Sequence, residues 1–187
     1  MQNSKRQHII ESALPLFNEY GFHNTGVNLI MEKAGISKKT LYAHFRTKDD
    51  LIAAVLQYGD AVSRNNFMRI VDRSSEDPKE KLLAAFDATK DWFNQKDFFG
   101  CTFVNVIAEY SEDTSQIRNI CQQSKKLKRD YLYEICLEAN LKTPEALADK
   151  LVLLIEGATV TAQVSKSDDA ANTAKMIAAQ LIEAASQ

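Results

Sequence analysis

Four consecutive polar residues have the side chains that a nucleic-acid-reading helix needs at its N-terminal end. They comprise two hydroxyls and two cations: Ser37, Lys38, Lys39 and Thr40. Lysine ammonium groups bind guanine edges or phosphates, and hydroxyls donate or accept hydrogen bonds at either. The residues that follow give the same segment, KKTLYAHF, an apolar side formed by Leu41, Tyr42 and Phe45. Such a segment can pack on a neighbour while its polar end enters a major groove about 12 Å wide.

A second short segment is placed to be that neighbour. VNLIMEKA has apolar residues at helical spacing, namely Val27, Ile30, Met31 and Ala34. Gly35 and Ile36 interrupt the pattern, Ser37 can cap the next helix, and Ala34 supplies the small residue needed where two helices cross. We therefore predict a helix-turn-helix between about Thr25 and Phe45.

The rest of the chain also has helical periodicity, so we predict an all-α fold of about nine helices. The first helix is expected at 4–20, bent slightly at Pro15 and stopped by Gly21. Thr47 caps a fourth helix that reaches about Val71, and a linker at 74–78 follows. Later helices are predicted at 78–95, 101–110, 114–139, 145–165 and 170–186, with breaks at Asp97–Gly100, Ser111–Thr114, Leu141–Pro144 and Ser165–Asp169.

Composition narrows the class of protein. Residues 1–48 carry seven Lys and Arg against three acids, a charge of +4, whereas the whole chain of 187 residues carries −2, which leaves −6 for residues 49–187. A basic N-terminal segment followed by an acidic remainder is typical of a protein that binds DNA through its N-terminal region. No apolar run could span a membrane and the N-terminus lacks a signal peptide, so we expect a cytoplasmic protein without a membrane partner.

Nothing in the sequence predicts catalysis, a metal site or a cofactor. The three cysteines, Cys101, Cys121 and Cys136, lack CxxC spacing, so neither a closed disulfide framework nor zinc is expected. The three histidines suggest no catalytic constellation, and no phosphate-binding glycine loop is present. An enzyme is therefore not expected. A helix-turn-helix activator or architectural factor, or a pure interaction module, stays open as an alternative.

The region 21–51 resembles the N-terminal signature of the TetR family of transcriptional regulators. The shared positions are Gly21-Phe22, Thr25, Ile30, Ala34 to Ser37, Thr40 to Tyr42, His44-Phe45, Lys48 and Leu51, with Arg6, Ile9, Ala13 and Phe17 upstream. The chain departs from the family at Lys39, where many members have Gly, and at Ala43, where many have a larger side chain. These departures leave the operator sequence unpredicted.

The resemblance implies roles for individual residues. Thr25 and Gly26 would donate to phosphate; Lys38, Lys39 and Thr40 would face the groove; Tyr42 and Lys48 would hold the backbone on either side. Arg6, Ser37 and His44 complete the predicted DNA-binding set. The alternatives are a solvated surface for the two lysines, a packing role for Tyr42, a structural role for His44 and a disordered tail for Arg6.

A helix-turn-helix of this size reads a half-site, so a palindromic operator of double-stranded DNA needs a dimer. The resemblance implies a domain at 1–48 for DNA and a domain at 49–187 for effector binding and dimerisation. The two last helices would form a four-helix dimer bundle through Leu151, Leu154, Ile155, Ala158, Ala162, Ile177 and Leu181. The alternative is that these residues pack only within their own chain.

The aromatic middle helices suggest where a small-molecule effector binds. In TetR-like proteins helices at this position surround a cavity, and its occupant would release the DNA. The predicted lining is Trp92, Phe99, Cys101, Asn105 and Tyr110, although an aromatic stripe is more often core. Cys101 lies at a predicted helix start, which favours a thiolate, and GCTFVNVIAE resembles a segment of electrophile-responsive regulators. Cys101 is thus a candidate sensor, with an inert thiol as the alternative.

Overall fold

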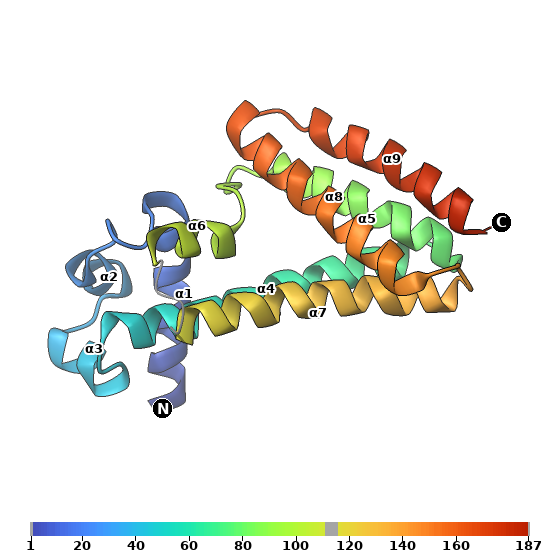
Figure 1. Cartoon of the computed structure of the whole chain (residues 1–187). Coiled ribbons are helices and arrows are strands. Elements are labelled where there is room, and N and C mark those ends of the chain that lie inside the picture. Colours follow the sequence, from blue (N-terminus) through green and yellow to red (C-terminus); the bar gives the residue numbers. More distant parts are fainter. Residues whose placement is uncertain (1, 111–115, 187) are drawn as a thin grey trace. The chain divides into compact units, whose positions relative to one another are not determined.

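The computed structural model describes residues 2–110 and 116–186, and within these ranges every regular element is an α-helix. The helices follow one another through short connections (Figure 1). They are α1 (Gln2–Tyr20), α2 (Val27–Ala34), α3 (Lys38–His44), α4 (Lys48–Ser74), α5 (Pro78–Phe93), α6 (Thr102–Glu109), α7 (Gln116–Glu138), α8 (Pro144–Ser165) and α9 (Asp169–Ser186).

The predicted helices agree with the observed ones to within about three residues. α1 continues through Pro15 and ends before Gly21, whose φ of 83° is the left-handed conformation that glycine adopts without strain. The predicted break at Ser111–Thr114 and the predicted start of the seventh helix at 114 lie outside the described residues.

The starts of α4 and α5 are set by side chains that accept backbone N–H groups. Thr47 Oγ1 accepts the N–H of Asp50 (3.1 Å), and an Asp50 carboxylate oxygen accepts the N–H of Thr47 (3.1 Å), which completes a capping box before α4. Asp77 accepts the N–H of Lys79, and Pro78 takes the first helical position of α5.

The chain divides into two compact units. The first comprises the described residues of 1–62 and 101–123, and the second those of 63–100 and 124–187. Residues 49–62, α6 and the start of α7 therefore pack with the N-terminal helices, beyond the predicted boundary at 48.

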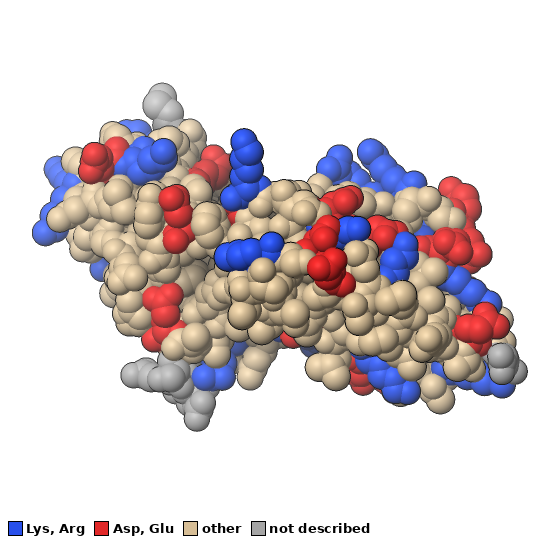
Figure 2. All heavy atoms as spheres, turned by 90° about the horizontal axis from the view of Figure 1, so that it is seen from above, with Lys and Arg blue, Asp and Glu red and all other residues tan. Residues whose placement is uncertain are grey.

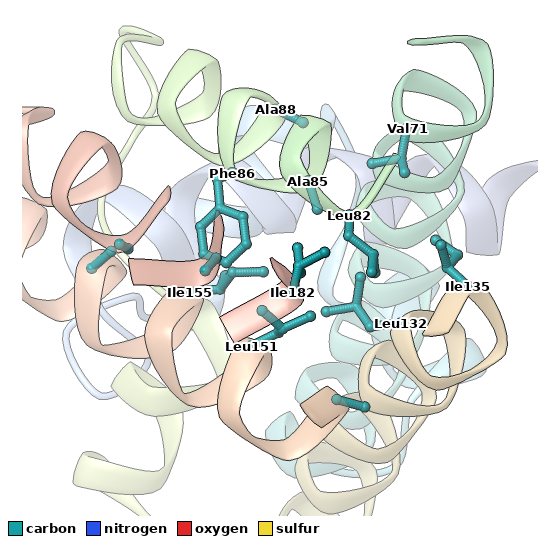
Figure 3. Packing of buried hydrophobic residues seen from close by; sticks show 14 of the residues in the cluster. Val71, Leu82, Ala85, Phe86, Ala88, Leu132, Ile135, Leu151, Ile155 and Ile182 are labelled. Atoms are coloured by element: carbon teal, nitrogen blue, oxygen red, sulfur yellow. The ribbon is translucent and has the colours of Figure 1, made fainter. Parts of the chain in front are cut away.

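Each unit has its own hydrophobic core. In the first, α1, α2, α3 and the start of α4 contribute fully buried side chains, and the rings of Phe17 and Phe22 stack at 4.9 Å. In the second, Phe86, Leu132, Leu151 and Ile182 come from four helices and point toward one another (Figure 3). In the part of the chain that the structure describes, no helix combines the length and apolar character needed to cross a membrane.

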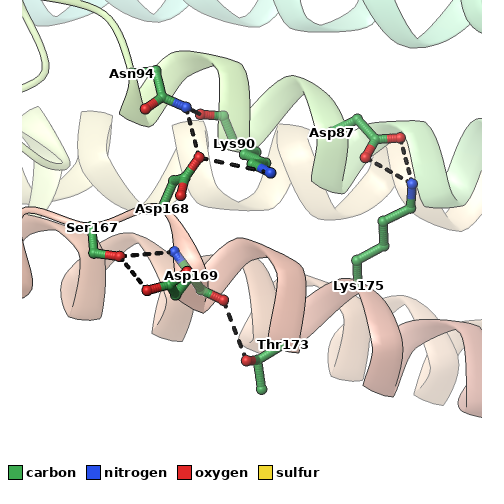
Figure 4. Close-up of polar contacts among 8 residues, drawn as sticks. All are labelled: Asp87, Lys90, Asn94, Ser167, Asp168, Asp169, Thr173 and Lys175. Atoms are coloured by element: carbon green, nitrogen blue, oxygen red, sulfur yellow. Dashed lines mark hydrogen bonds and ion pairs between the residues drawn. The ribbon is translucent and has the colours of Figure 1, made fainter.

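Ion pairs and hydrogen bonds join α5 to α9 and to the loop before it (Figure 4). Lys175 donates to both carboxylate oxygens of Asp87 at 2.7 Å. Asp168 accepts from Asn94 at 2.9 Å and lies 3.8 Å from the Lys90 ammonium. Because these groups are partly exposed, they orient α9 more than they stabilise it.

Candidate DNA-binding surface

The two short helices and their turn form as predicted. Gly35 adopts φ 62° in the left-handed region, and the N–H groups of Gly35 and Ile36 bond back to the carbonyls of α2. Ala34 is buried where the chain turns, and its carbonyl lies 3.0 Å from Nε2 of His8 on α1. The turn is thereby fixed both within α2 and against α1.

The N-terminal end of α3 presents its polar side chains to solvent. Ser37 caps the helix by accepting the N–H of Thr40 at 3.2 Å, as predicted, and the two hydroxyl oxygens lie 3.0 Å apart. Lys38 and Lys39 are exposed, whereas Leu41 and Phe45 on the opposite side are buried. This arrangement leaves two cations and two hydroxyls available on one edge of the helix.

Aromatic rings lie close to two of the predicted cationic contacts. The Lys38 ammonium is 6.0 Å from the ring centre of Tyr42, which is itself 44% exposed. The Arg6 guanidinium lies 5.1 Å from the ring centre of Phe45, so Arg6 is placed against the domain by a cation–π contact rather than in a free tail. His44 is half-buried in the last turn of α3. Basic side chains gather at the left end of the view in Figure 2, the end that carries α2 and α3 in Figure 1.

Thr25 is placed differently from its predicted phosphate contact. It is fully buried, its hydroxyl donates to the carbonyls of Leu16 (3.1 Å) and Gly21 (2.6 Å), and its N–H also bonds to Gly21. Both donors are used inside the fold because the α1–α2 turn has to satisfy its own buried carbonyls. Gly26 is exposed and begins α2 without a side-chain cap, so a phosphate contact at this helix start can use backbone N–H groups.

Lys48 takes part in the same turn. Its ammonium donates to the carbonyl of His23 at 3.3 Å, and partial burial lowers the pKa of Lys48, with Asp49 and Glu109 opposing that shift. The lysine therefore already has a structural partner within its own unit.

Two functional candidates were absent from the sequence interpretation, namely Glu109 at the end of α6 and His23 in the α1–α2 turn. Glu109 accepts the backbone N–H groups of Phe22 (2.9 Å) and His23 (2.5 Å). Glu109 lies 87 and 86 residues from these two amides, and apolar periodicity says nothing about contacts at that separation, so the pairing is visible only in the folded chain.

The predicted dimer residues are mostly core residues of the second unit. Leu151, Ile155, Ala158 and Ala162 are buried against their own chain, and Leu151 and Ile155 point into the core in Figure 3. Leu154 and Leu181 are half-buried against the same core, and only Ile177 is well exposed. The exposed apolar residues of α8 and α9 are instead Leu153, Val160, Val164, Met176 and Ile177.

The predicted effector lining is divided between the two units. Trp92 and Phe99 belong to the second unit, where the Trp92 ring packs on Phe93 and Phe98 at 5.7 and 4.9 Å. Cys101, Asn105 and Tyr110 belong to the first, where Tyr110 stacks on His23 at 4.8 Å. None of the five lines the cavity of about 180 Å³ in the second unit, whose walls are Phe93, Asn94, Gln95, Phe98, Ala162, Lys166, Ser167 and Asp168.

Metal binding has no support in the described ranges 2–110 and 116–186. They contain no group of three or more His, Cys, Asp or Glu side chains that could hold an ion.

Comparison with known proteins agrees with this geometry. Residues 9–55 match the family model for bacterial regulatory proteins of the tetR family, and residues 78–179 match the model for the LmrA/YxaF-like transcriptional regulator C-terminal domain. YerO of Bacillus subtilis, an HTH-type transcriptional regulator, is 31% identical over 70% of this chain, which spans 46% of that relative. YjdC of Escherichia coli, also an HTH-type transcriptional regulator, is 22% identical over 95% of this chain and 93% of its own.

Solved structures share the fold along the whole chain. The TetR-family regulator SCO4454 of Streptomyces coelicolor superposes with a TM-score of 0.88 at 24% identity, covering 99% of this chain and 97% of its own. The reduced form of Escherichia coli NemR gives a TM-score of 0.85 at 21% identity, covering 96% and 98%. The helix-turn-helix, the all-helical fold and both family models lead to one conclusion: this chain belongs to the TetR family of bacterial transcriptional regulators, which bind DNA and are not enzymes.

Proposed function

We propose that this chain is an operator-binding repressor that acts as a homodimer in the cytoplasm and is released from a palindromic site by a small molecule. The observation that carries the proposal is the polar edge at the start of α3, where Ser37, Lys38 and Lys39 are exposed and Thr40 is half-exposed, opposite a buried apolar side. The two lysines would contact base edges or phosphates in the major groove. The DNA backbone contacts that set the register of the protein would come from Arg6, Tyr42, His44 and the start of α2 at Gly26.

Dimerisation is supported by an exposed apolar stripe on α8. Leu153, Gly157, Val160 and Val164 are spaced by four, three and four residues, and all four are exposed. A side chain added at Gly157 would meet no atom within 4 Å, so a partner helix can approach closely there. Met176 and Ile177 add exposed apolar area on α9. We propose this face, with Ile177 retained from the predicted set, as the dimer interface.

Effector binding is supported by a cavity whose walls all belong to the second unit. The cavity of about 180 Å³ has two phenylalanine rings, Phe93 and Phe98, beside the amides of Asn94 and Gln95 and the ammonium of Lys166. A volume close to that of a benzene-sized cavity suits a small aromatic or short acyl compound. Trp92 packs on both rings and so connects the predicted aromatic region to this cavity.

Selection of duplexes from a random-sequence library, followed by mobility shift, tests the proposal. We expect the wild type to enrich a palindromic sequence and to bind it more weakly as salt rises. Lys39→Ala should weaken binding to the selected duplex by about tenfold or more and relax its base preference. Lys96→Ala, which removes an exposed lysine of the other unit, is the matched control. Enrichment of no sequence, or equal binding by Lys39→Ala, would contradict the proposal.

A second candidate is that the releasing signal is an electrophile that modifies Cys101. Cys101 is half-buried at the start of α6, whereas Cys121 and Cys136 are buried, and burial raises the pKa of Cys136 to about 11. A reactive compound should therefore reach Cys101 first. We expect N-ethylmaleimide to release the selected duplex from the wild type and not from Cys101→Ser. Release from both proteins would reject a sensor role for Cys101.

A further inference from the structure

The α1–α2 turn, which leads into the DNA-reading helices, is bound by the last residue of a helix far away in sequence. The two carboxylate oxygens of Glu109 accept the N–H groups of Phe22 and His23, at 2.9 and 2.5 Å. Glu109 and both amides belong to the same compact unit. One side chain of α6 therefore grips two consecutive backbone donors in the turn that precedes α2.

His23 completes a two-sided connection. Its ring Nε2 lies 2.8 Å from the backbone carbonyl of Glu109, a distance at which it donates a hydrogen bond. The same ring stacks on Tyr110 with 4.8 Å between centres and 14° between planes. The carbonyl of His23 also accepts from Lys48 at the start of α4. An exposed turn residue is thus held from α6 and from α4 together.

The approach of α6 depends on a glycine. Gly21 has φ 83°, and a Cβ at this position would lie 3.1 Å from Glu109 Oε1, so an L-side chain would be strained and would crowd the carboxylate. At the other end of α6, Thr102 donates to the Asn18 side chain of α1 at 2.8 Å. Both ends of α6 are therefore joined to the C-terminal part of α1 and its turn.

The position of the turn controls the position of α2 and α3. Thr25 holds the turn from inside through its buried hydroxyl, and Glu109 holds it from outside. α2 starts directly after the turn, and α3 follows through the fixed Gly35 turn. We propose that Glu109, with His23 and Tyr110, is a positioning residue for operator binding: α6 sets the pose of the helix-turn-helix on α1.

The direction in which DNA affinity changes when Glu109 loses its charge separates a positioning role from no role. Removing a negative charge from a DNA-binding unit strengthens binding to polyanionic DNA when the charge has no other role. Loss of a positioning contact does the opposite, because α3 then samples poses that do not fit the groove. The proposal therefore predicts weaker operator binding from a change that makes the unit more positive.

The experiment compares Glu109→Gln and Glu109→Ala with Glu32→Gln, a matched loss of charge at an exposed acid on α2. The probe is the duplex selected by the wild type, with a scrambled duplex of equal length as the non-specific reference. We expect Glu109→Ala to weaken operator binding by about tenfold, the scale of a lost hydrogen bond to a charged group. Glu109→Gln keeps one acceptor and should lie between it and the wild type. Glu32→Gln should bind as well as the wild type or better.

A positioning role is separated from mere structural support by the ratio of the affinity for the selected duplex to the affinity for the scrambled duplex. This ratio is measured under conditions in which circular dichroism shows each variant to be folded. The proposal requires that ratio to fall in both Glu109 variants and in Tyr110→Leu, which removes the stacking ring without touching the carboxylate. A ratio equal to that of the wild type, or tighter binding by Glu109→Gln, would overturn it. The inference rests on operator binding, so a wild type that selects no duplex would refute both proposals, whereas unchanged Glu109 variants would refute this one alone.

Discussion

At the scale of single residues, polar side chains that bind DNA and those that hold the fold together have the same types. Thr25 and Thr40 are both threonines beside a helix start, yet one hydroxyl is buried with two carbonyl partners and the other is half-exposed next to Ser37. The spacing of apolar residues predicts which face of a helix is buried. It does not predict where a carbonyl in a turn needs a donor, and the family resemblance, from which the phosphate role of Thr25 is taken, does not show this either.

Substitution of Thr25 tests its structural role. Thr25→Val keeps the shape of the side chain but removes the hydroxyl hydrogen bonds to the carbonyls of Leu16 and Gly21. We expect the free energy of unfolding to fall by about 1–3 kcal/mol in urea titrations. Thr25→Ser retains the hydroxyl and is the control, with a smaller loss from one missing methyl group. A Thr25→Val protein as stable as the wild type that binds the selected duplex weakly would restore the phosphate role.

At the scale of elements, the sequence predicted the helices from apolar periodicity, from recognisable caps at several starts, and from Gly, Pro or polar clusters at the breaks. Ser37, Thr47 and Pro78 lie where the structure has helix starts. The attachment of α6 to the α1–α2 turn was not predicted, because it depends on one carboxylate, Glu109, and on amides 86 and 87 residues away. Local propensity contains no information about such a contact.

The contact between α6 and its unit should also appear in the alkaline stability of the protein. Burial first, and then the neighbouring charge of Asp49, raises the pKa of Tyr110 to about 12. A tyrosine pKa raised on folding means that the neutral ring is favoured in the folded state. Its contribution to stability is complete below about pH 10, the pKa of the unfolded chain, and is lost as the pH rises toward 12.

Tyr110→Phe removes this titration and keeps the ring that stacks on His23. We expect the difference in thermal midpoint between the wild type and Tyr110→Phe to be constant between pH 7 and 9. From pH 10 upward it should change in favour of the phenylalanine variant. Other tyrosines titrate equally in both proteins, so the difference isolates Tyr110. A difference that stays flat up to pH 11.5 would show that Tyr110 has an ordinary pKa.

At the scale of the whole molecule, the sequence supports a dimer, but α8 has two stripes of apolar residues that could equally form its interface. The predicted set includes Leu151, Ile155, Ala158 and Ala162, spaced by four, three and four residues. The exposed stripe, Leu153, Gly157, Val160 and Val164, has the same spacing two residues further along. Two residues are about 200° around an α-helix, so the stripes lie on opposite faces. Because both are apolar and contain small residues, only the fold shows which one is core.

Two substitutions on α8 therefore test the assembly at this scale. Leu153 is 72% exposed, so Leu153→Glu should change the free energy of unfolding of the monomer by no more than about 0.5 kcal/mol. In a two-fold interface the substitution occurs once on each subunit, so two negative charges enter the apolar contact. We expect sedimentation velocity to show that Leu153→Glu is monomeric at concentrations where the wild type is dimeric. In mobility shifts, Leu153→Glu should bind the palindrome more weakly than the wild type does.

A substitution of Leu151, on the other face of α8, should have the opposite effect: it should lower the stability of the fold. It is fully buried, so Leu151→Ala should lower the free energy of unfolding by about 2–5 kcal/mol through the cavity that it leaves. Leu137→Glu, at an apolar α7 residue that is 43% exposed, controls for a new surface charge and should remain dimeric. Since the two α8 stripes are related by half a helical turn, the experiment separates them cleanly: a dimer that survives Leu153→Glu and Val164→Glu would place the interface elsewhere on the chain.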